Sequence, residues 1–497
     1  MDAEQLKEDV RAGRIAPERL VDVIAVLQRE LAEAKHRIEE LEKKLGGSGT
    51  ARVEEPFSMR AEEERQGARG RKTGKRNRPL RRGRVSTAEK IAQAQRREKV
   101  FPEGVAEADC TRSHTRPVWR LENGQAVLVA YEIYRGPGNR YGKIPGVLGR
   151  GEYGIELLVT IAHLVFVVGV SLDQVCLLLN FFQNMKLRKS QVDAMLNQLS
   201  RHWEGEFDIL CTLLANSAVV HADETSWSLN SVWAFLSEKV RVVLFGVHKD
   251  ASTLEQLLNP ATFAGIVVSD DASVYANFTQ SQKCWAHLLR KAIKLTLLDP
   301  SNAEFRTFTD RLLDIYRAAC RVQRDGRLAD AGRARKVAEL DDEILKLCFR
   351  LWAAELPPSE GPFNDYRLLI NELMRLMLAQ QLFTFVTAAP VTTPSGETMP
   401  VAGTNNEAER TLRSPARARD AGRTSKTIRG ARRRSVIVSV LESLRQHLRT
   451  FTLSTVINEV RSWCETRVSC FAKLLRKLKL TPPSVSILDL VLPAPGG

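Results

Sequence analysis

Two short apolar runs in the middle of the chain each lead to an aspartate. Asp223 comes shortly after residues 218–220, Ala-Val-Val, and Asp270 directly follows residues 265–269, Gly-Ile-Val-Val-Ser. Short apolar runs bounded by polar residues are typical of buried β-strands. We therefore expect both carboxylates at the exits of buried strands, so the middle of the chain is predicted to fold around a sheet.

A third acid follows far downstream, at the start of a helical pattern. Residues 405–410 have the sequence Asn-Asn-Glu-Ala-Glu-Arg, and we expect Glu409 to join Asp223 and Asp270. Three such acids can hold two divalent ions about 3.5–4 Å apart, which stabilise the attacking and leaving oxygens of a phosphoryl transfer. Either aspartate alone is better explained as a strand end or a helix cap. Together the three acids predict a two-metal site.

Glu407 is the competing acid on the same helix. The spacing from Thr404 to Glu407 is that of a capping box, so we expect Glu407 to have a structural role. Glu409 lies two residues further on, about 200° around a helix of 3.6 residues per turn. The two side chains are therefore not expected to face the same site. A second register, with Asn406 as N-cap, would instead make Glu409 the capping residue.

The charge and hydropathy of the chain narrow the classes of partner. With 497 residues we expect several domains, and the net charge of +15 favours an anionic partner such as a nucleic acid or a membrane surface. The most apolar stretch, residues 155–172, is interrupted by polar residues and is predicted to be a buried helix pair rather than a membrane span. The first residues carry no secretory signal, so we expect a cytoplasmic protein without a membrane partner.

The eight cysteines form no Cys-x-x-Cys pair. Neither a disulfide framework nor a zinc site built from four cysteines is therefore expected. Cys110 and His114 could begin a ligand set, but no second pair follows them closely. We interpret Cys110 as a loop cysteine and the other cysteines mostly as small core residues.

Residues 1–47 are predicted to form a coiled coil that links copies of the chain into a homo-oligomer. The seven-residue spacing of apolar side chains, with charges between them, is that of a coiled-coil seam. A single amphipathic helix packed on the rest of the chain would give the same pattern. The seam residues are Leu20, Ile24, Leu27, Leu31, Ala34, Ile38, Leu41 and Leu45.

Residues 48–100 are predicted to be a basic disordered linker, because they have few apolar side chains to bury. Between residues 69 and 84 no acid offsets the basic side chains, which favours contact with phosphates without reading of bases. A solvated linker is the alternative. The candidate contacts are Arg71, Lys72, Lys75 and Arg76.

The remaining chain is predicted to be α/β, with an RNase H-like core interrupted by helices. Three antiparallel strands, a helix and two further strands are expected in the first part of the core. Three helical patterns before it resemble a helix-turn-helix, although any three-helix core gives the same pattern. The predicted parts are a helical DNA-binding region at 101–215, the first part of the core at 216–295, a helical insertion at 296–395, and the second part of the core with C-terminal helices at 396–497.

Four motifs follow one another at residues 223–227, 269–275, 284–290 and 405–413. Taken in this order, they resemble the IS66-type transposases, a DDE family of bacterial insertion sequences. The resemblance implies that Asp223, Asp270 and Glu409 are catalytic and bind two Mg²⁺ ions, with Mn²⁺ as an alternative. It also implies cutting of double-stranded DNA at the element ends and joining to a target by a DNA 3′-hydroxyl, with accessory transposition proteins as candidate partners, in the nucleoid.

The chain departs from the family pattern in two places. The family usually carries a cysteine-rich zinc segment ahead of the core, whereas Cys110 stands alone here, so zinc is not expected. Thr404 also stands where the family commonly has an aspartate. The basic candidates for phosphate or DNA contact near the core are His287, Arg290, Arg410 and Arg413. For His287 and Arg290, pairing with local acids is an equal alternative.

Two other functions remain open at this point. A coiled-coil DNA-binding regulator with an inactive core is disfavoured by the intact acids at all three positions. A nuclease of the same fold, without a joining step, is not separated from a transposase by the sequence.

Overall fold

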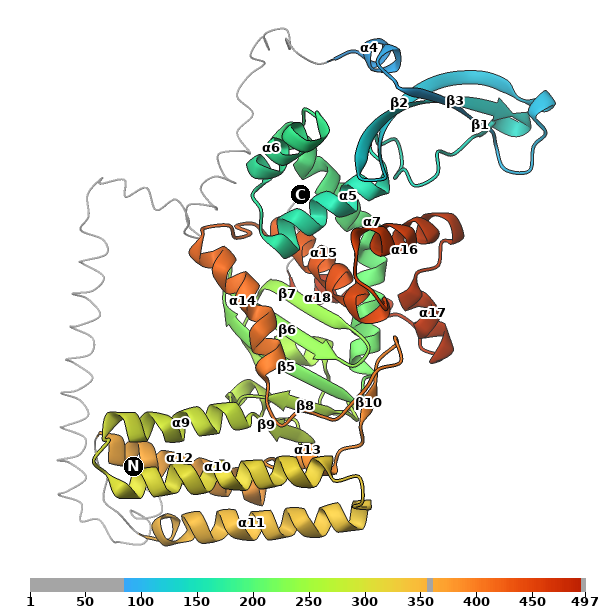
Figure 1. The fold of residues 1–497 in the computed structure, drawn as a ribbon. Helices are drawn as coiled ribbons and strands as arrows, with labels where there is room; N and C mark the ends of the chain where they lie inside the picture. Colours follow the sequence, from blue (N-terminus) through green and yellow to red (C-terminus); the bar gives the residue numbers. More distant parts are fainter. Residues whose placement is uncertain (1–84, 355–360, 493–497) are drawn as a thin grey trace, which may run out of the picture. The chain divides into compact units, whose positions relative to one another are not determined.

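The computed structural model describes residues 85–354 and 361–492 of the chain (Figure 1). The predicted coiled coil at 1–47 and the basic residues Arg71, Lys72, Lys75 and Arg76 lie outside the described residues.

The described residues form strands and helices in alternation. The strands are β1 (Arg96–Val100), β2 (Thr111–Glu122), β3 (Gln125–Gly136), β4 (Arg140–Tyr141), β5 (Val219–Ser226), β6 (Ser231–Ser237), β7 (Arg241–Val247), β8 (Ile266–Ser269), β9 (Ser281–Lys283), β10 (Val391–Thr392) and β11 (Thr398–Met399). The helices are α4 (Thr87–Ala92), α5 (Ile155–His163), α6 (Leu172–Gln183), α7 (Lys189–Ala215), α8 (Ala251–Leu257), α9 (Trp285–Leu298), α10 (Ala303–Arg324), α11 (Asp330–Trp352), α12 (Pro362–Leu378), α13 (Thr384–Thr387), α14 (Asn406–Asp420), α15 (Ile428–His447), α16 (Leu453–Thr466), α17 (Cys470–Lys477) and α18 (Ile487–Val491). Short η turns cover Glu107–Asp109, Pro137–Asn139, Leu164–Val168 and Ser273–Tyr275.

A five-stranded sheet in the order β7-β6-β5-β8-β9 carries the predicted acids. Strands β5, β6 and β7 form an antiparallel meander, and β8 and β9 continue the sheet parallel to β5. Helix α8 connects the meander to β8. Every residue of β6 is buried, as expected for a run rich in Val, Trp, Ala and Phe. The predicted order of three antiparallel strands, a helix and further strands is confirmed.

Helix α15 covers the outer edge of β7. The backbone N–H groups of alternate β7 residues donate to serine hydroxyls spaced four apart on α15, from Arg241 to Ser443, from Val243 to Ser439 and from Phe245 to Ser435, at 2.8–2.9 Å. The two spacings match, because two strand residues span about 6.7 Å and four helical residues about 6 Å. The serines therefore satisfy buried strand donors and block pairing at this edge.

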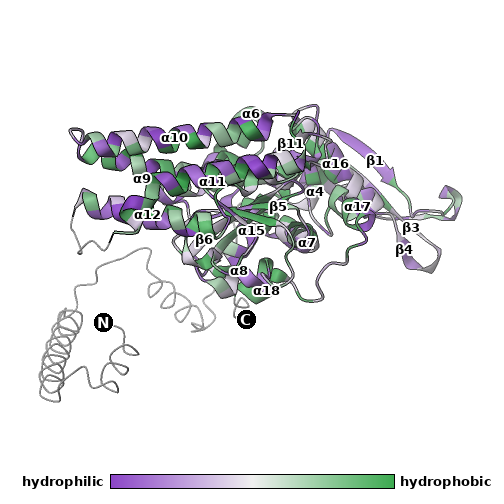
Figure 2. Cartoon of the chain, turned by 90° about the horizontal axis from the view of Figure 1, so that it is seen from below, coloured by the Kyte–Doolittle hydropathy of each residue, from purple (hydrophilic) through white to green (hydrophobic). Residues whose placement is uncertain are grey.

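Helices α9, α10, α11 and α12 pack side by side around their own core (Figure 1). The surfaces of α10 and α11 are mixed in hydropathy, with hydrophobic and hydrophilic residues alternating along each helix (Figure 2). This is the pattern of helices that bury one face, and Trp285, Phe305 and Leu373 are among the buried side chains. Helices α10–α12 occupy the range in which the sequence predicts a helical insertion.

The N-terminal part of the described chain differs from the prediction. The predicted linker at 48–100 includes α4 and β1, and the predicted helical region at 101–215 begins with β2 and β3. These two strands pair antiparallel around a turn at Asn123 and Gly124, and β1 runs parallel to β3. The expectation of helices is therefore wrong for residues 111–136. Their β-branched and aromatic residues and the Asn-Gly pair are hairpin signals that outweigh the helical reading.

Three helices do occupy the second half of that region. Ser171 caps α6 with a reciprocal capping box to Gln174. The 27-residue α7 begins after Arg188 and not behind a serine, and its apolar face packs on α15 and the central sheet. Packing of α7 in the core does not test whether these helices contact DNA. The helix-turn-helix interpretation therefore stays a prediction. Among the described helices, none combines the length and the apolar character needed to cross a membrane.

Candidate active site on two parallel strands

The register of β5 and β8 places the two predicted aspartates side by side. His221 of β5 pairs with Val268 of β8 in a parallel ladder. Two residues further along each strand come Asp223 and Asp270, so they stand at the same level of neighbouring strands, whose spacing is about 4.8 Å. Strand β8 ends at Ser269, so Asp270 stands at a strand exit as expected. Strand β5 continues past Asp223 to Ser226, because its pairing with β6 extends that far, so the expectation of a strand exit is wrong for Asp223.

Asp223 lies in a strongly acidic environment. Burial and the carboxylates of Glu224, Asp270 and Glu409 raise the pKa of Asp223 from its usual value near 3.8 to about 7. Burial is the largest cause, and the neighbouring negative charges act in the same direction because they disfavour a further charge. Asp223 forms no ion pair with any other described residue. The three predicted acids therefore share one electrostatic site.

The fourth acid, Glu224, is compensated from within the protein. Its side chain is almost fully buried, forms an ion pair of 2.7 Å with Lys249, and accepts a hydrogen bond from the hydroxyl of Tyr275. Sequence reasoning did not assign these roles, although Glu224 and Tyr275 belong to two of the quoted motifs. Lys249 lies in the loop after β7 and carried no signal.

Asn405 attaches the start of α14 to the strand that carries Asp223. Asn405 is fully buried, and its side-chain amide donates to the carbonyl of Ala222 at 2.8 Å. Its backbone N–H donates to Sγ of Cys284 at 3.1 Å, and its carbonyl accepts the N–H of Glu409 at 3.2 Å. The first turn of α14, and with it Glu409, is therefore held next to Asp223.

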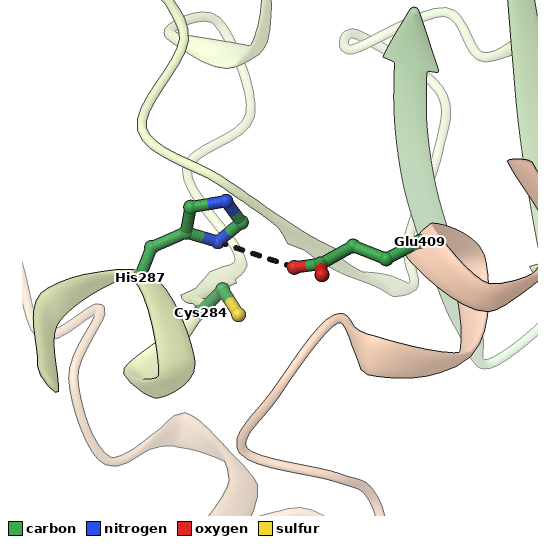
Figure 3. A group of neighbouring side chains, drawn as sticks. All are labelled: Cys284, His287 and Glu409. Atoms are coloured by element: carbon green, nitrogen blue, oxygen red, sulfur yellow. Dashed lines mark ion pairs between the residues drawn. The ribbon is translucent and has the colours of Figure 1, made fainter. Parts of the chain in front are cut away.

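The carboxylate of Glu409 points from α14 toward the start of α9 (Figure 3). Arg290 donates to both of its oxygens, at 2.7 and 3.0 Å, and Nδ1 of His287 lies 3.6 Å from Oε1. The structure thus places His287 and Arg290 beside a local acid, which was one of the two alternatives for them. The acid is itself one of the three predicted metal ligands.

Glu407 does not have the predicted capping role. The N-cap of α14 is Asn405, without a side-chain cap, so neither the box from Thr404 nor the register with Asn406 as N-cap is present. Glu407 is about half exposed and forms an ion pair with Arg241 at the start of β7. The expectation that Glu407 and Glu409 face different neighbours is confirmed.

A cavity of about 620 Å³ opens beside Asp270, between the end of the sheet, α9 and α12. Two of its cations are paired with acids, Lys291 with Glu372 at 2.6 Å and Arg375 with Asp271, whereas Lys283 donates to the hydroxyl of Ser269 and the carbonyl of Asp270. Lys291 and Arg375 were missed by sequence reasoning. No sequence signal could have found Arg375, because it reaches the site from an amphipathic helix about a hundred residues downstream.

Arginines form an exposed row along α14. Arg410, Arg413 and Arg417 are all exposed and are spaced three and four residues apart, which places them on one side of the helix. None of the three forms an ion pair with another residue of the described ranges. This row, which we call the α14 arginine row, starts at the residue that follows Glu409.

The oxygen donors at the site suit hard divalent ions. Mg²⁺ is bound in proteins mainly by carboxylates and water, and the raised pKa of Asp223 indicates that its neighbours repel a negative charge that a cation would neutralise. Asp223, Asp270 and Glu409 are therefore a fitting ligand set.

A family model matches most of the central part of the chain. The search of curated proteins finds no similar sequence. The model of the IS66 transposase family matches residues 150–433, a range that contains the central sheet, helices α9–α14 and all four motifs. Strands β1–β4 and helices α16–α18 lie outside the match. Because this family model covers more than half of the 497 residues, the chain belongs to the IS66 family of transposases.

Proposed function

We propose that the chain cuts the ends of an insertion sequence and joins them to target DNA by metal-dependent phosphoryl transfer. Asp223, Asp270 and Glu409 are the proposed ligands of two Mg²⁺ ions, with Mn²⁺ as an alternative. The observation that carries the proposal is the acidic cluster around Asp223, whose pKa of about 7 reflects burial and the charges of Asp270 and Glu409. The three acids come from two parallel strands and one helix.

We also propose that the central sheet is the RNase H-like core expected from the sequence. Its support is the strand order, with the two antiparallel strands β6 and β7 on one side of β5 and the two parallel strands β8 and β9 on the other. The first acid lies on the middle strand, the second follows the adjacent parallel strand, and the third lies on a helix that packs on β5 and β6.

When bound, the two ions supply Lewis acidity toward the scissile phosphate and activate water or a DNA 3′-hydroxyl as nucleophile. Residues of the chain itself determine the charge of one ligand and the position of another. With its pKa near 7, Asp223 is only partly ionised at neutral pH without metal, and its proton must leave before it can act as a ligand. Asn405 holds the first turn of α14 against β5, and Arg290 orients the carboxylate of Glu409.

DNA is the partner that a transposase family implies, and the α14 arginine row suits its backbone. Three exposed guanidinium groups in a row can neutralise successive phosphates without reading bases. Their position directly after Glu409 would bring the backbone to the acidic cluster. The net charge of +15 favours the same partner at long range.

The experiment uses the full chain, a DNA duplex that carries the element end, and Mg²⁺. We expect Asp223→Asn and Asp270→Asn to lower the cleavage rate by about 100-fold or more, equivalent to roughly 2.7 kcal/mol of barrier. Both variants should retain DNA binding and the circular dichroism of the folded chain. Cleavage at the normal rate in either variant would contradict the assignment.

The joining step separates the transposase from a nuclease of the same fold. A pre-cut element end with a free 3′-hydroxyl is incubated with a supercoiled plasmid and Mg²⁺. Covalent insertion of the end into the plasmid is expected. Cleavage without any insertion would instead support the nuclease, and binding without either reaction would support the regulator with an inactive core.

A further inference from the structure

We infer that Cys284, His287 and Glu409 form a binding site for one thiophilic divalent ion of the Zn²⁺ class. The site shares Glu409 with the proposed Mg²⁺ ligands but differs from them in its sulfur and nitrogen donors. Binding at this cluster stands on its own geometry. Its consequence for catalysis rests on the proposed function.

The three ligand atoms already lie close together. Sγ of Cys284, a ring nitrogen of His287 and a carboxylate oxygen of Glu409 are all within 4.8 Å of one another, and the side chains point toward a common centre (Figure 3). Bonds of about 2.0–2.3 Å to a four-coordinate zinc ion place tetrahedral neighbours roughly 3.3–3.6 Å apart. The distance of 3.6 Å between Nδ1 of His287 and Oε1 of Glu409 is close to that value. An ion therefore requires only small side-chain movements.

Nδ1 of His287 provides a second, independent observation. This nitrogen is buried and has no hydrogen-bond partner. Its nearest acidic oxygen, on Glu409, lies at 3.6 Å, which is too far for a hydrogen bond. A buried polar atom without a partner costs about 1–3 kcal/mol, and a metal ion placed between nitrogen and carboxylate would remove that cost.

Cys284 is placed to act as a thiolate ligand. It is 1% exposed and stands at the N-cap of α9, where the helix dipole favours negative charge. Its sulfur accepts the N–H of Asn405 at 3.1 Å. Both contacts favour negative charge on the sulfur, and the thiolate is the form that binds a metal ion.

The donor set selects the metal. One sulfur, one imidazole nitrogen and one carboxylate oxygen suit Zn²⁺ or Co²⁺, whereas Mg²⁺ prefers oxygen donors alone. Three protein ligands leave a fourth position for water. The expectation against zinc rested on the lack of cysteine pairs in the sequence, and this cluster needs none, because α14 supplies Glu409 from a distant segment.

Glu409 cannot serve both sites at once. An ion held by Cys284 and His287 would hold the carboxylate in its present direction, toward α9, and keep it from turning to an ion at Asp223 and Asp270. Zn²⁺ is therefore expected to inhibit the Mg²⁺-dependent reaction by removing its third ligand.

The binding test titrates the metal-free full chain with Co²⁺, whose thiolate complexes absorb in the near ultraviolet. We expect one Co²⁺ per chain with this absorption, and its displacement by Zn²⁺. Cys284→Ser should abolish the absorption, and His287→Gln should weaken binding at least about 10-fold. The matched control is Cys348→Ser, a fully buried cysteine on α11 outside the cluster, which should bind as the unchanged chain does. Thiolate absorption that persists in folded Cys284→Ser, or its absence from the unchanged chain, would overturn the inference.

The inhibition test compares cleavage with and without Zn²⁺ at saturating Mg²⁺, as a ratio within each variant. Zn²⁺ should lower the cleavage rate of the unchanged chain at least about 10-fold. It should lower the rate of Cys284→Ser less than twofold, because this variant has lost affinity for the ion. Equal inhibition of both would overturn the shared use of Glu409. If no cleavage occurs in any variant, the proposed function fails, while the Co²⁺ absorption still decides whether the site exists.

Discussion

The side chains of Glu407 and Glu409 lie two positions apart on α14 and contact different neighbours. Glu409 pairs with Arg290 of α9, and Glu407 pairs with Arg241 of β7. Their helical spacing predicted this divergence, but the partner of each came from a distant segment. The capping role expected for Glu407 fails because Asn405, one residue later than Thr404, is buried and begins the helix.

The first prediction compares the two glutamates directly. Glu409→Gln should lower the cleavage rate by about 100-fold or more, because an amide is a poor ligand for Mg²⁺. Glu407→Gln loses a half-exposed ion pair, which contributes about 0–1 kcal/mol to stability, and should keep its cleavage rate within threefold. Rates are measured on the same DNA end. An inactive Glu407→Gln together with an active Glu409→Gln would reverse the assignment.

Asp223 gives a prediction of pH dependence. Its pKa is raised to about 7 in the folded chain, so between about pH 4 and pH 7 the folded state binds a proton that the unfolded state has released. Without metal, the free energy of unfolding should therefore fall by an amount on the order of a few kcal/mol as the pH rises through this window.

Asp223→Asn removes this titrating group, so its metal-free unfolding should depend less on pH. Denaturant unfolding at pH 5 and pH 8 in the presence of a chelator measures the difference. Mg²⁺ should restore stability at pH 8 in the unchanged chain and not in the variant. An equal pH dependence in both chains would show that Asp223 does not titrate near neutrality.

Among the elements, α15 is the clearest case of a helix whose serines have a role that its own sequence does not reveal. Its residues are buried on nearly all sides, and three of its serines meet the edge of β7 with matching spacing. In a helix taken alone, serines at this spacing would be interpreted as a polar stripe facing water. Their role becomes apparent only when the edge strand is placed beside them.

The element-scale prediction concerns Ser439, the middle serine. Ser439→Ala leaves the N–H and carbonyl of Val243 without this partner in a buried interface, which should lower the free energy of unfolding by about 1–3 kcal/mol. Ser414→Ala, an exposed serine on α14, should stay within about 0.5 kcal/mol of the unchanged chain. Chemical denaturation measures both. A Ser439→Ala chain as stable as its control would mean that the edge contacts contribute nothing.

At the scale of the whole molecule, the basic residues fall into groups with different surroundings: some are paired or buried, and others are exposed. Many arginines are paired with acids or buried, such as Arg434, whose pKa is lowered to about 10 by burial. The α14 arginine row is exposed and adjoins the candidate site. The predicted coiled coil at 1–47 and the phosphate contacts expected from Arg71, Lys72, Lys75 and Arg76 stay predictions, because these residues lie outside the described ranges.

The whole-molecule prediction is the salt dependence of DNA binding. Replacing Arg413 and Arg417 by Gln should reduce the slope of log affinity against log salt by about 0.9 for each lost phosphate contact. The loss should be equal for element ends and unrelated duplexes. Arg311→Gln on α10 is the control, since it lies far along the chain in the helical bundle and should keep the slope. An unchanged slope in the double variant would remove the α14 arginine row from the DNA interface.

The sequence by itself determined the local features of this protein. Two apolar runs predicted the strands near Asp223 and Asp270, and the helical spacing of Glu407 and Glu409 predicted their divergence. Such features depend on the periodicity of a strand or a helix, which a few neighbouring residues specify. The hairpin of β2 and β3 was missed although its local signals were present, because a helical interpretation was extended over it.

Only the tertiary structure decided which distant residues meet. Arg290, Asn405 and Cys284 surround Glu409 because α9 and α14 pack against the same end of the sheet, and Ser439 meets Val243 because α15 closes its edge. These contacts join residues separated by roughly 120 to 200 positions along the chain. Their identity follows from how buried surfaces fit together, and no spacing in the sequence encodes that fit.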